Sequence, residues 1–440
     1  MNFSSLVFIF VFLPVLFLLF YLVPKKFKYL ILLLGSIVFY SYSGLFNLIV
    51  LLCVSTFNYF ITRIFGGKKK FNLILVVLAL LNIFTLLLFK YNKNLLFPLG
   101  ISFYIFNNVS YIIDVKRKKI KPEKNYLYYL LYSMLFCHVT MGPIIRYENI
   151  SKDLKRLDYS FDDVTSGFRR FLNGLFKKVL FADSFGLLYA TLIGVSEKSS
   201  LLIIMSLVVF GLQLYLDFSG YCGMAIGLGK MIGVKYPENF DYPYMSLSIS
   251  EFWRRWHITL SDFFKEYIYF PMGGNRVSKL RNIFNLLVVW FLTGIWHGNS
   301  WNFLLWGIYY GIIIILEKYI LKKLLEKMPK IIRHIYVLLI VLIGYIFFSF
   351  NSMESISNVF KILFTGQFIN STVVFYLKEN LLYIIIGCLL CCKIPKVIND
   401  FIRNKKVFNV IIFCGYIILL LITISYILSG SYQPFLYNNF

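Results

Sequence analysis

Charged residues are scarce in this chain of 440 residues. They make up 15% of the sequence, whereas hydrophobic residues make up 59%, and the mean hydropathy is +0.74. Soluble domains carry roughly a quarter charged residues, and a soluble chain of this length would separate two or three domains by polar linkers. No such linker interrupts the apolar tracts. These absences exclude a soluble enzyme, a disordered chain and a secreted disulfide scaffold, and they indicate a helical protein that crosses a membrane several times.

Acidic residues are the rarer of the two charged classes. The chain has 20 Asp and Glu against 45 Lys and Arg, which gives a formal net charge of +25. In a soluble protein this excess would suggest nucleic-acid binding. Here the basic residues fall mostly between apolar tracts, a pattern typical of cytoplasmic loops that touch anionic headgroups. We therefore expect a lipid bilayer as a partner and no nucleic acid.

Metal-binding patterns are also missing. The four histidines and seven cysteines form no HxxxH or HExxH spacing and no Cys/His cluster. Cys388 and Cys391 are spaced like a CxxC pair, but they lie in an apolar tract without a second pair. A nucleophile elbow and a phosphate-binding Walker A loop are absent from the sequence. We predict no metal site and no bound cofactor.

The apolar tracts predict the topology. Several are shorter than the ~20 residues of a simple span, so we expect roughly ten to twelve crossings mixed with re-entrant or interfacial helices. Leu6–Val23 has no basic residue before it, whereas Lys25, Lys26 and Lys28 follow it. This pattern predicts a retained first span, a multi-pass protein of the plasma membrane, an N-terminus outside and most basic loops in the cytoplasm. Tyr432 to Phe440 are expected outside.

One segment, 161–182, has a different pattern. Asp162 and Asp163 can cap a helix, and an apolar stripe of Phe, Leu and Val follows. Basic residues flank the stripe: Arg169, Arg170, Lys177 and Lys178. The segment is predicted to be an amphipathic helix in the cytoplasmic membrane interface.

The block 213–306 is unusually rich in polar, aromatic and ionisable residues. Such residues are costly in or beside a bilayer, so they indicate a water-filled cavity or a site. His257 follows Trp253-Arg-Arg-Trp256, and His297 ends an apolar span beside Trp296. A lone histidine here is as often structural as functional, but two in one block favour function. A neutral imidazole can take a proton from an attacking hydroxyl at physiological pH.

Four strings in this block carry a specific resemblance. They are Pro237-Glu-Asn-Phe-Asp-Tyr-Pro-Tyr244, Phe252-Trp-Arg-Arg-Trp-His-Ile-Thr-Leu-Ser261, Pro271-Met-Gly-Gly-Asn-Arg276 and Gly294-Ile-Trp-His-Gly298. In this order they closely resemble the membrane-bound O-acyltransferase (MBOAT) family, and most of all its alginate O-acetylation branch. Asn2–Leu6, Pro98–Phe103, Gly142–Tyr147 and Asp217–Tyr221 resemble the same branch. The chain departs from the branch at Cys137-His138, where a Pro-Gln-type pair is usual, and at Cys222-Gly223, where Ser-Asp is frequent.

The resemblance implies a fold and a reaction. Residues 1–440 would form a single domain, a ring of helices around a central pore, with 213–306 as its catalytic core. An acyl group, expected to be acetyl, would pass from a cytoplasmic thioester such as acetyl-CoA to hydroxyls of an extracellular or cell-wall polysaccharide. His297 would be the general base and His257 the second pore histidine. A second, extracytoplasmic acetyltransferase partner protein is expected to complete the transfer.

Other residues, most of them in the block, are candidates for roles at the site. Asp217 can orient an imidazole or line the pore, or it can be a paired structural residue. Trp296, Asn299 and Asn302 stand beside the predicted base and can donate to an oxyanion. Arg254 and Arg255 can meet donor phosphates, although interface anchoring is the stronger interpretation. His138 is a local substitute for the family's usual residue or a third pore histidine.

The sequence is also compatible with three alternative functions. One is D-alanyl transfer to teichoic acid by the same pore mechanism. Another is transport of a lipid-linked glycan, which also requires polar residues within the membrane but favours repeat symmetry that the sequence does not show. The third is a non-catalytic scaffold for a polysaccharide synthase. Loss of acyl transfer on mutation of His297 would favour the enzyme over the last two.

Overall fold

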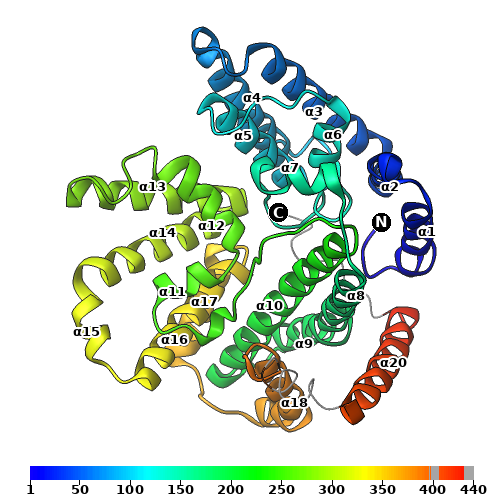
Figure 1. The fold of residues 1–440 in the computed structure, drawn as a ribbon. Coiled ribbons are helices and arrows are strands. Elements are labelled where there is room, and N and C mark those ends of the chain that lie inside the picture. The colour runs from blue at the N-terminus through cyan, green and yellow to red at the C-terminus, as the bar shows by residue number, and fades with distance from the viewer. Residues whose placement is uncertain (396, 398–405, 431–440) are drawn as a thin grey trace. The chain divides into compact units, whose positions relative to one another are not determined.

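The chain is all-helical in the computed structural model, which describes residues 1–395, 397 and 406–430 (Figure 1). Among these residues the only β-pairing is one bridge between Phe240 and Trp256. The predicted all-α class is therefore confirmed. The chain divides into two compact units: unit 1 holds residues 1–175 and 221–238, and unit 2 holds 176–220 and the residues from 239 onward. The prediction for Tyr432 to Phe440 lies outside the described residues.

Unit 1 is a set of α-helices joined by turns and by longer loops such as 135–146. Its helices are α1 (Leu13–Leu22), α2 (Lys28–Ser41), α3 (Leu45–Phe65), α4 (Asn72–Tyr91), α5 (Ile101–Lys116), α6 (Tyr126–Met134), α7 (Tyr147–Arg156) and most of α8 (Phe161–Phe176). A π-helical turn at Phe8–Phe12 precedes α1, and 3₁₀ turns at Lys25–Phe27 and Lys69–Phe71 precede α2 and α4.

Helix α5 forms the core of unit 1. Every residue of it except Ile113 and Lys116 is buried, and α3, α4 and α6 pack against it. A helix buried all round must satisfy its polar groups internally. Asn107 Oδ1 accepts the amide of Ile145 at 2.9 Å, and Asn108 Oδ1 accepts the hydroxyl of Tyr129 at 2.9 Å. These bonds fix the register of α5 against the neighbouring helix and loop.

Unit 2 holds the block that the sequence singled out. Its α-helices are α9 (Asp183–Gly194), most of α10 (Ser200–Met231), α11 (Ile249–Arg255), α12 (Ile258–Phe264), α13 (Lys279–His297), α14 (Trp301–Leu316), α15 (Lys322–Lys327), α16 (Lys330–Ser349), α17 (Met353–Thr365), α18 (Ser371–Leu390) and α20 (Lys406–Leu428). Three π-helical turns lie at η4 (Lys177–Ala182), η6 (Lys265–Tyr269) and η7 (Glu317–Leu321), and a 3₁₀ turn lies at η5 (Pro243–Met245).

Helices α13 and α14 form a close antiparallel hairpin in unit 2 (Figure 1). Glycine makes the approach possible on both helices. A Cβ atom on Gly294 would lie 2.7 Å from the carbonyl oxygen of Phe303, and one on Gly307 would lie 2.4 Å from that of Trp290. Backbone oxygens cannot move away cheaply, so larger residues would separate the helices. His297 is the last residue of α13, directly before the turn of this hairpin.

Seven described helices are long and apolar enough to cross a membrane: Leu45–Phe65, Lys69–Tyr91, Ser200–Met231, Trp301–Lys327, Lys330–Ser349, Ser371–Leu390 and Val410–Leu428. Roughly ten to twelve crossings were expected, and shorter or more polar helices such as α5 and α13 are not among these seven. The chain is a multi-pass membrane protein.

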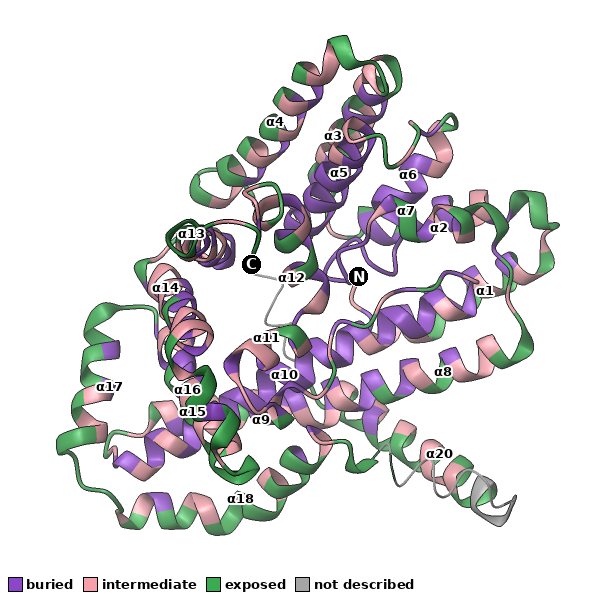
Figure 2. Cartoon of the chain, turned by 60° about the vertical axis from the view of Figure 1, so that its left-hand side comes forward, coloured by how far each residue is buried: buried purple, intermediate pink, exposed green. Residues whose placement is uncertain are grey.

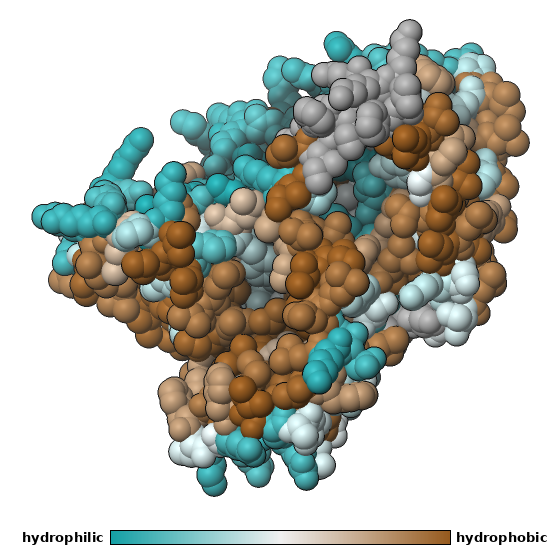
Figure 3. Space-filling view, turned by 90° about the horizontal axis from the view of Figure 1, so that it is seen from below, coloured by the Kyte–Doolittle hydropathy of each residue, from teal (hydrophilic) through white to brown (hydrophobic). Residues whose placement is uncertain are grey.

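The long apolar helices differ in how much protein covers them. In α10, 78% of the most apolar window is buried, whereas the share is 11% in α18 and 6% in α20 (Figure 2). The space-filling view shows apolar side chains over broad areas of the surface (Figure 3). Such areas are too large for a soluble monomer and are expected where lipid is the solvent. Helix α10 is thus the core of unit 2, and α18 and α20 present apolar side chains outward.

The segment 161–182 is helical throughout, as α8 and the π-helical turn η4. Its charged residues do not all face outward, however. Arg169 is exposed and Arg170 is half-buried, but Lys178 is 1% exposed. Its placement in the membrane interface remains a prediction, whereas Lys178, one of the basic residues expected to flank the apolar stripe, is buried.

Candidate functional site

His297 is the last residue of α13 and lies in an aromatic enclosure. It is 3% exposed, and its ring centroid lies 4.7 Å from Trp296, 4.7 Å from Trp306 and 5.4 Å from Phe348. The contacts with Trp306 and Phe348 are edge-to-face, at 78° in both. These rings come from three helices, α13, α14 and α16, so the hairpin and its neighbour together fix the imidazole.

His257 lies between α11 and α12 in a strained backbone conformation. Its φ is +44°, in the left-handed region that side chains other than glycine rarely adopt, and the residue is 2% exposed. Such strain persists only where the surroundings enforce it, and it concentrates at functional sites. Burial lowers the pKa of the imidazole to about 3, so His257 is neutral at physiological pH.

Asn239 determines which ring nitrogen of His257 carries the proton. The Asn239 Oδ1 atom accepts from the Thr259 amide at 3.1 Å and from the Thr259 hydroxyl at 3.0 Å, which identifies it as the oxygen of the carboxamide. The same oxygen lies 3.2 Å from His257 Nδ1. Because a carbonyl oxygen only accepts, Nδ1 must donate, and the basic lone pair of the neutral ring is at Nε2.

Trp296 packs against both histidines. Its ring lies 5.9 Å from that of His257 and 4.7 Å from that of His297, measured between centroids. Two histidines 40 positions apart in the sequence are therefore brought into contact with one indole. The structure thus joins the two histidines and Trp296 that the sequence singled out.

An aromatic cluster holds the two histidine-bearing elements together. Trp253, on α11, lies 4.9 Å from Trp290, 5.4 Å from Trp306 and 4.8 Å from Tyr310, all in edge-to-face contacts. Trp290 belongs to α13, and the other two belong to α14. Such pairs add stability beyond their buried area and prefer defined angles, so they position α11 as well as attach it.

Asp217 has a lysine partner. Its Oδ1 atom accepts from Lys178 Nζ at 2.7 Å, and the same ammonium lies 2.7 Å from Asp183 Oδ1. All three side chains are at most 3% exposed. The geometry favours the paired structural interpretation of Asp217 over a role in orienting imidazole. The next residue, Phe218, packs edge-on against His257 at 4.8 Å, so the ion-pair cluster also supports the site.

The two arginines of α11 differ in their surroundings. Arg254 is exposed. Arg255 donates to Glu251 at 2.7 Å and lies 3.8 Å from Asp241 Oδ2, so two carboxylates already neutralise it. Of the two, Arg254 is the one available for an anionic ligand.

The two asparagines near His297 also differ. Asn302 is 1% exposed, donates to the Phe347 carbonyl at 3.0 Å and accepts the hydroxyl of Ser300. Its amide ties the hairpin turn to α16 and is not directed at a substrate. Asn299 is exposed and lies two residues after His297. Asn299 is therefore the better placed of the two to meet a ligand.

His138 lies in unit 1 and is engaged at both ring nitrogens. Nδ1 lies 3.0 Å from the hydroxyl of Tyr236, and Nε2 lies 2.9 Å from the carbonyl oxygen of Tyr132. Because that carbonyl accepts, Nε2 donates, and Nδ1 accepts from the hydroxyl. The residue is fully buried. These contacts describe a structural histidine.

Three residues that sequence reasoning missed support the site. Asn239 lies within the quoted string Pro237–Tyr244, but nothing in its spacing indicated a contact with His257. Lys178 looked like a surface charge beside an apolar stripe, and Phe348 looked like any residue of an apolar span. The contacts of Asn239 with His257, of Lys178 with Asp217 and of Phe348 with His297 join residues distant in the sequence, so no local pattern could identify them.

Comparison with known proteins identifies the family. The family model described as MBOAT, membrane-bound O-acyltransferase family, matches residues 32–394. A probable alginate O-acetylase AlgI from Azotobacter vinelandii is 33% identical over 390 residues, covering 83% of this chain and 78% of the relative. The chain belongs to the membrane-bound O-acyltransferase family and is an acyltransferase, as the resemblance implied.

Two further relatives differ in their acceptors. A peptidoglycan O-acetyltransferase from Helicobacter pylori is 32% identical over 419 residues, covering 82% of this chain and 79% of the relative. A teichoic acid D-alanyltransferase from Bacillus subtilis is 28% identical over 234 residues, covering 50% of this chain and 59% of the relative. The chain is thus more similar to the O-acetylating relatives than to the D-alanylating one.

Proposed function

We propose that this protein transfers an acetyl group from a cytoplasmic thioester, acetyl-CoA, to hydroxyls of an extracellular or cell-wall polysaccharide. The observation that carries the proposal is the placement of His257 and His297 against Trp296 within a buried aromatic enclosure. A neutral imidazole there can remove the proton of an attacking hydroxyl, and the exclusion of water limits hydrolysis of the thioester.

In the proposed reaction His297 is the general base. It takes the proton of the acceptor hydroxyl while the hydroxyl oxygen attacks the thioester carbonyl. The C–S bond then breaks, and the leaving sulfur receives that proton from the His297 imidazolium and departs as the free thiol. His257, with its basic Nε2, orients the reacting groups or stabilises charge. Asn299 is the candidate donor to the oxyanion, and Arg254 is the candidate contact for donor phosphates.

The α13–α14 hairpin supports outward transfer. Basic residues gather at one end of it, namely Lys279, Arg281, Lys318 and Lys322. His297 is at the other end, about 27 Å away along the 1.5 Å rise of α13. If the basic end is cytoplasmic, His297 lies toward the outer face, where the polysaccharide is. A second, extracytoplasmic protein that carries acetyl onward to the polymer fits this arrangement.

D-alanyl transfer is the second candidate, because a teichoic acid D-alanyltransferase matches half of the chain. The test offers the purified protein radiolabelled acetyl-CoA or a D-alanyl thioester carrier, with soluble glycan acceptors, and measures thiol release. We expect release from acetyl-CoA to exceed that from the D-alanyl carrier by at least tenfold. Faster thiol release from the D-alanyl carrier would show that the transferred group is D-alanyl and not acetyl. Transfer of label to the glycan in the absence of any second protein would show that no partner protein is needed.

The orientation predicts which engineered cysteines react with an impermeant thiol reagent in intact cells. Lys69→Cys, in a basic loop, is expected to be labelled only after permeabilisation, and Asn439→Cys is expected to be labelled without it. The parent protein, whose seven native cysteines give the background, is the control. Labelling of Lys69→Cys in intact cells would reverse the orientation and contradict a cytoplasmic donor.

A further inference from the structure

Helix α11 is too short to be stable by itself. It has seven residues, and an isolated helix of that length does not form in water. Yet it carries Trp253 and leads directly into His257. The position of His257 thus depends on how the two ends of α11 are held by the rest of the protein.

Each of the first three backbone amides of α11 has a side-chain hydrogen-bond acceptor. Ser248 Oγ accepts the amide of Glu251 at 3.0 Å, and the Glu251 carboxylate accepts the amide of Leu247, the residue before the N-cap, at 2.9 Å, an arrangement similar to a capping box but displaced by one residue. The remaining two amides are bound by a distant residue. Glu317 accepts the amide of Ile249 at 2.6 Å through Oε1 and that of Ser250 at 2.8 Å through Oε2.

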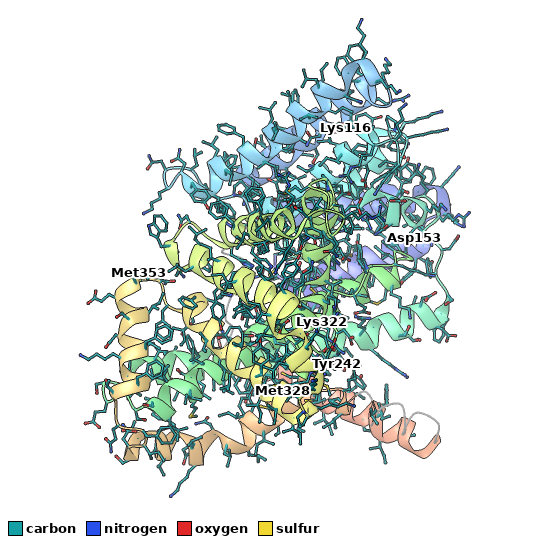
Figure 4. All side chains as sticks on the ribbon, turned by 90° about the vertical axis from the view of Figure 1, so that its left-hand side faces the viewer. Lys116, Asp153, Tyr242, Lys322, Met328 and Met353 are labelled. Atoms are coloured by element: carbon teal, nitrogen blue, oxygen red, sulfur yellow. The ribbon has the colours of Figure 1, made fainter. Side chains whose placement is uncertain are left out.

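Glu317 is placed for this contact by the hairpin that carries His297. It is 5% exposed and begins the π-helical turn η7, directly after α14. Its Oε2 atom also accepts the hydroxyl of Ser250 at 2.7 Å. A carboxylate at a helix N-terminus complements both the unpaired amides and the helix dipole. The chain can be followed from α14 through Lys322 to Met328 in Figure 4.

Glu317 therefore connects the two histidine-bearing elements at a second point. The aromatic contacts of Trp253 attach α11 to α13 and α14 near its C-terminal half. Glu317 attaches its N-terminus to the extension of α14. Because these two attachments act on different parts of α11, together they restrain its tilt as well as its position.

We propose that Glu317 is a positioning residue for acyl transfer: by capping α11 it sets His257 relative to His297. The inference rests on the proposed function for its catalytic consequence. Its structural part, the cap, can be tested without turnover. Glutamine at this position has nearly the same shape but carries no charge, and its amide nitrogen faces one of the two donors, so the cap is broken with little change in volume.

The experiment compares Glu317→Gln with wild type in the full-length protein. Hydrogen–deuterium exchange of peptides covering 247–257 reports the cap, and kcat and KM for acetyl-CoA report its consequence. We expect exchange to accelerate in 247–257 alone, kcat to fall about tenfold or more, and KM to change less than threefold. Glu317→Asp, which keeps the charge, is expected to recover part of kcat.

The control is Glu326→Gln, which removes an exposed carboxylate of α15. It is expected to change neither exchange nor kcat. The inference would be overturned if exchange in residues 247–257 of Glu317→Gln were unchanged or if its kcat stayed within twofold of wild type. Faster exchange throughout unit 2 would also overturn it, because this would indicate general destabilisation and not loss of one cap. Absence of turnover in wild type would count against the proposed function, while the exchange experiment would still decide whether Glu317 caps α11.

Discussion

Replacement of His297 by glutamine is expected to lower kcat for acetyl transfer by about 10²–10⁴-fold, the usual contribution of a general base. Glutamine fills a similar volume between Trp296, Trp306 and Phe348, so the aromatic enclosure stays largely intact. It has no group that is basic near neutral pH, however. The measurement is thiol release from radiolabelled acetyl-CoA by the purified protein, with KM determined separately.

The matched control for this experiment is His138→Gln. His138 is also fully buried, but both of its ring nitrogens serve hydrogen bonds within unit 1. Its substitution is expected to lower the melting temperature and to leave kcat of the folded protein within about threefold of wild type. If His297→Gln retained wild-type kcat while His257→Gln lost it, the base would be His257, whose Nε2 carries the lone pair of the neutral ring.

Replacement of Lys178 by methionine is expected to reduce strongly the fraction of protein molecules that fold. The substitution leaves Asp183 and Asp217 buried without the ammonium that lies 2.7 Å from each. Removal of one partner from a buried ion pair costs about 3–5 kcal/mol, a large share of the stability of most proteins. The measurement is the yield of monodisperse protein from membranes and its melting temperature in detergent.

A triple variant separates charge from packing at this cluster. Lys178→Met combined with Asp183→Asn and Asp217→Asn removes the uncompensated charge, so it is expected to recover much of the yield that Lys178→Met loses. Lys322→Met, at an exposed position of α15, is the control and is expected to behave as wild type. A stable Lys178→Met protein would show that the two carboxylates are accommodated without the lysine.

Some features of this protein follow from the sequence because they depend on composition and local pattern. The scarcity of charge and the long apolar tracts require helices in a membrane, since helices satisfy backbone groups without water. The order of the strings around His257 and His297 identified the family, and the comparisons confirmed it. Local sequence signals also predicted where some helices begin, such as the acidic residues in the first turn of α8.

Tertiary structure alone decided which polar residues meet. The sequence placed Lys178 among the basic residues that flank an apolar stripe, but helix α10 brings Asp217 against it, and both side chains are buried. It offered Asn302 as an oxyanion donor, but the amide is engaged by Phe347 in α16. It gave no reason to connect Glu317 with α11, 68 residues away. The physical reason is common to these cases: a periodic pattern shows which face of a helix is buried, whereas the partner on that face depends on how distant helices pack.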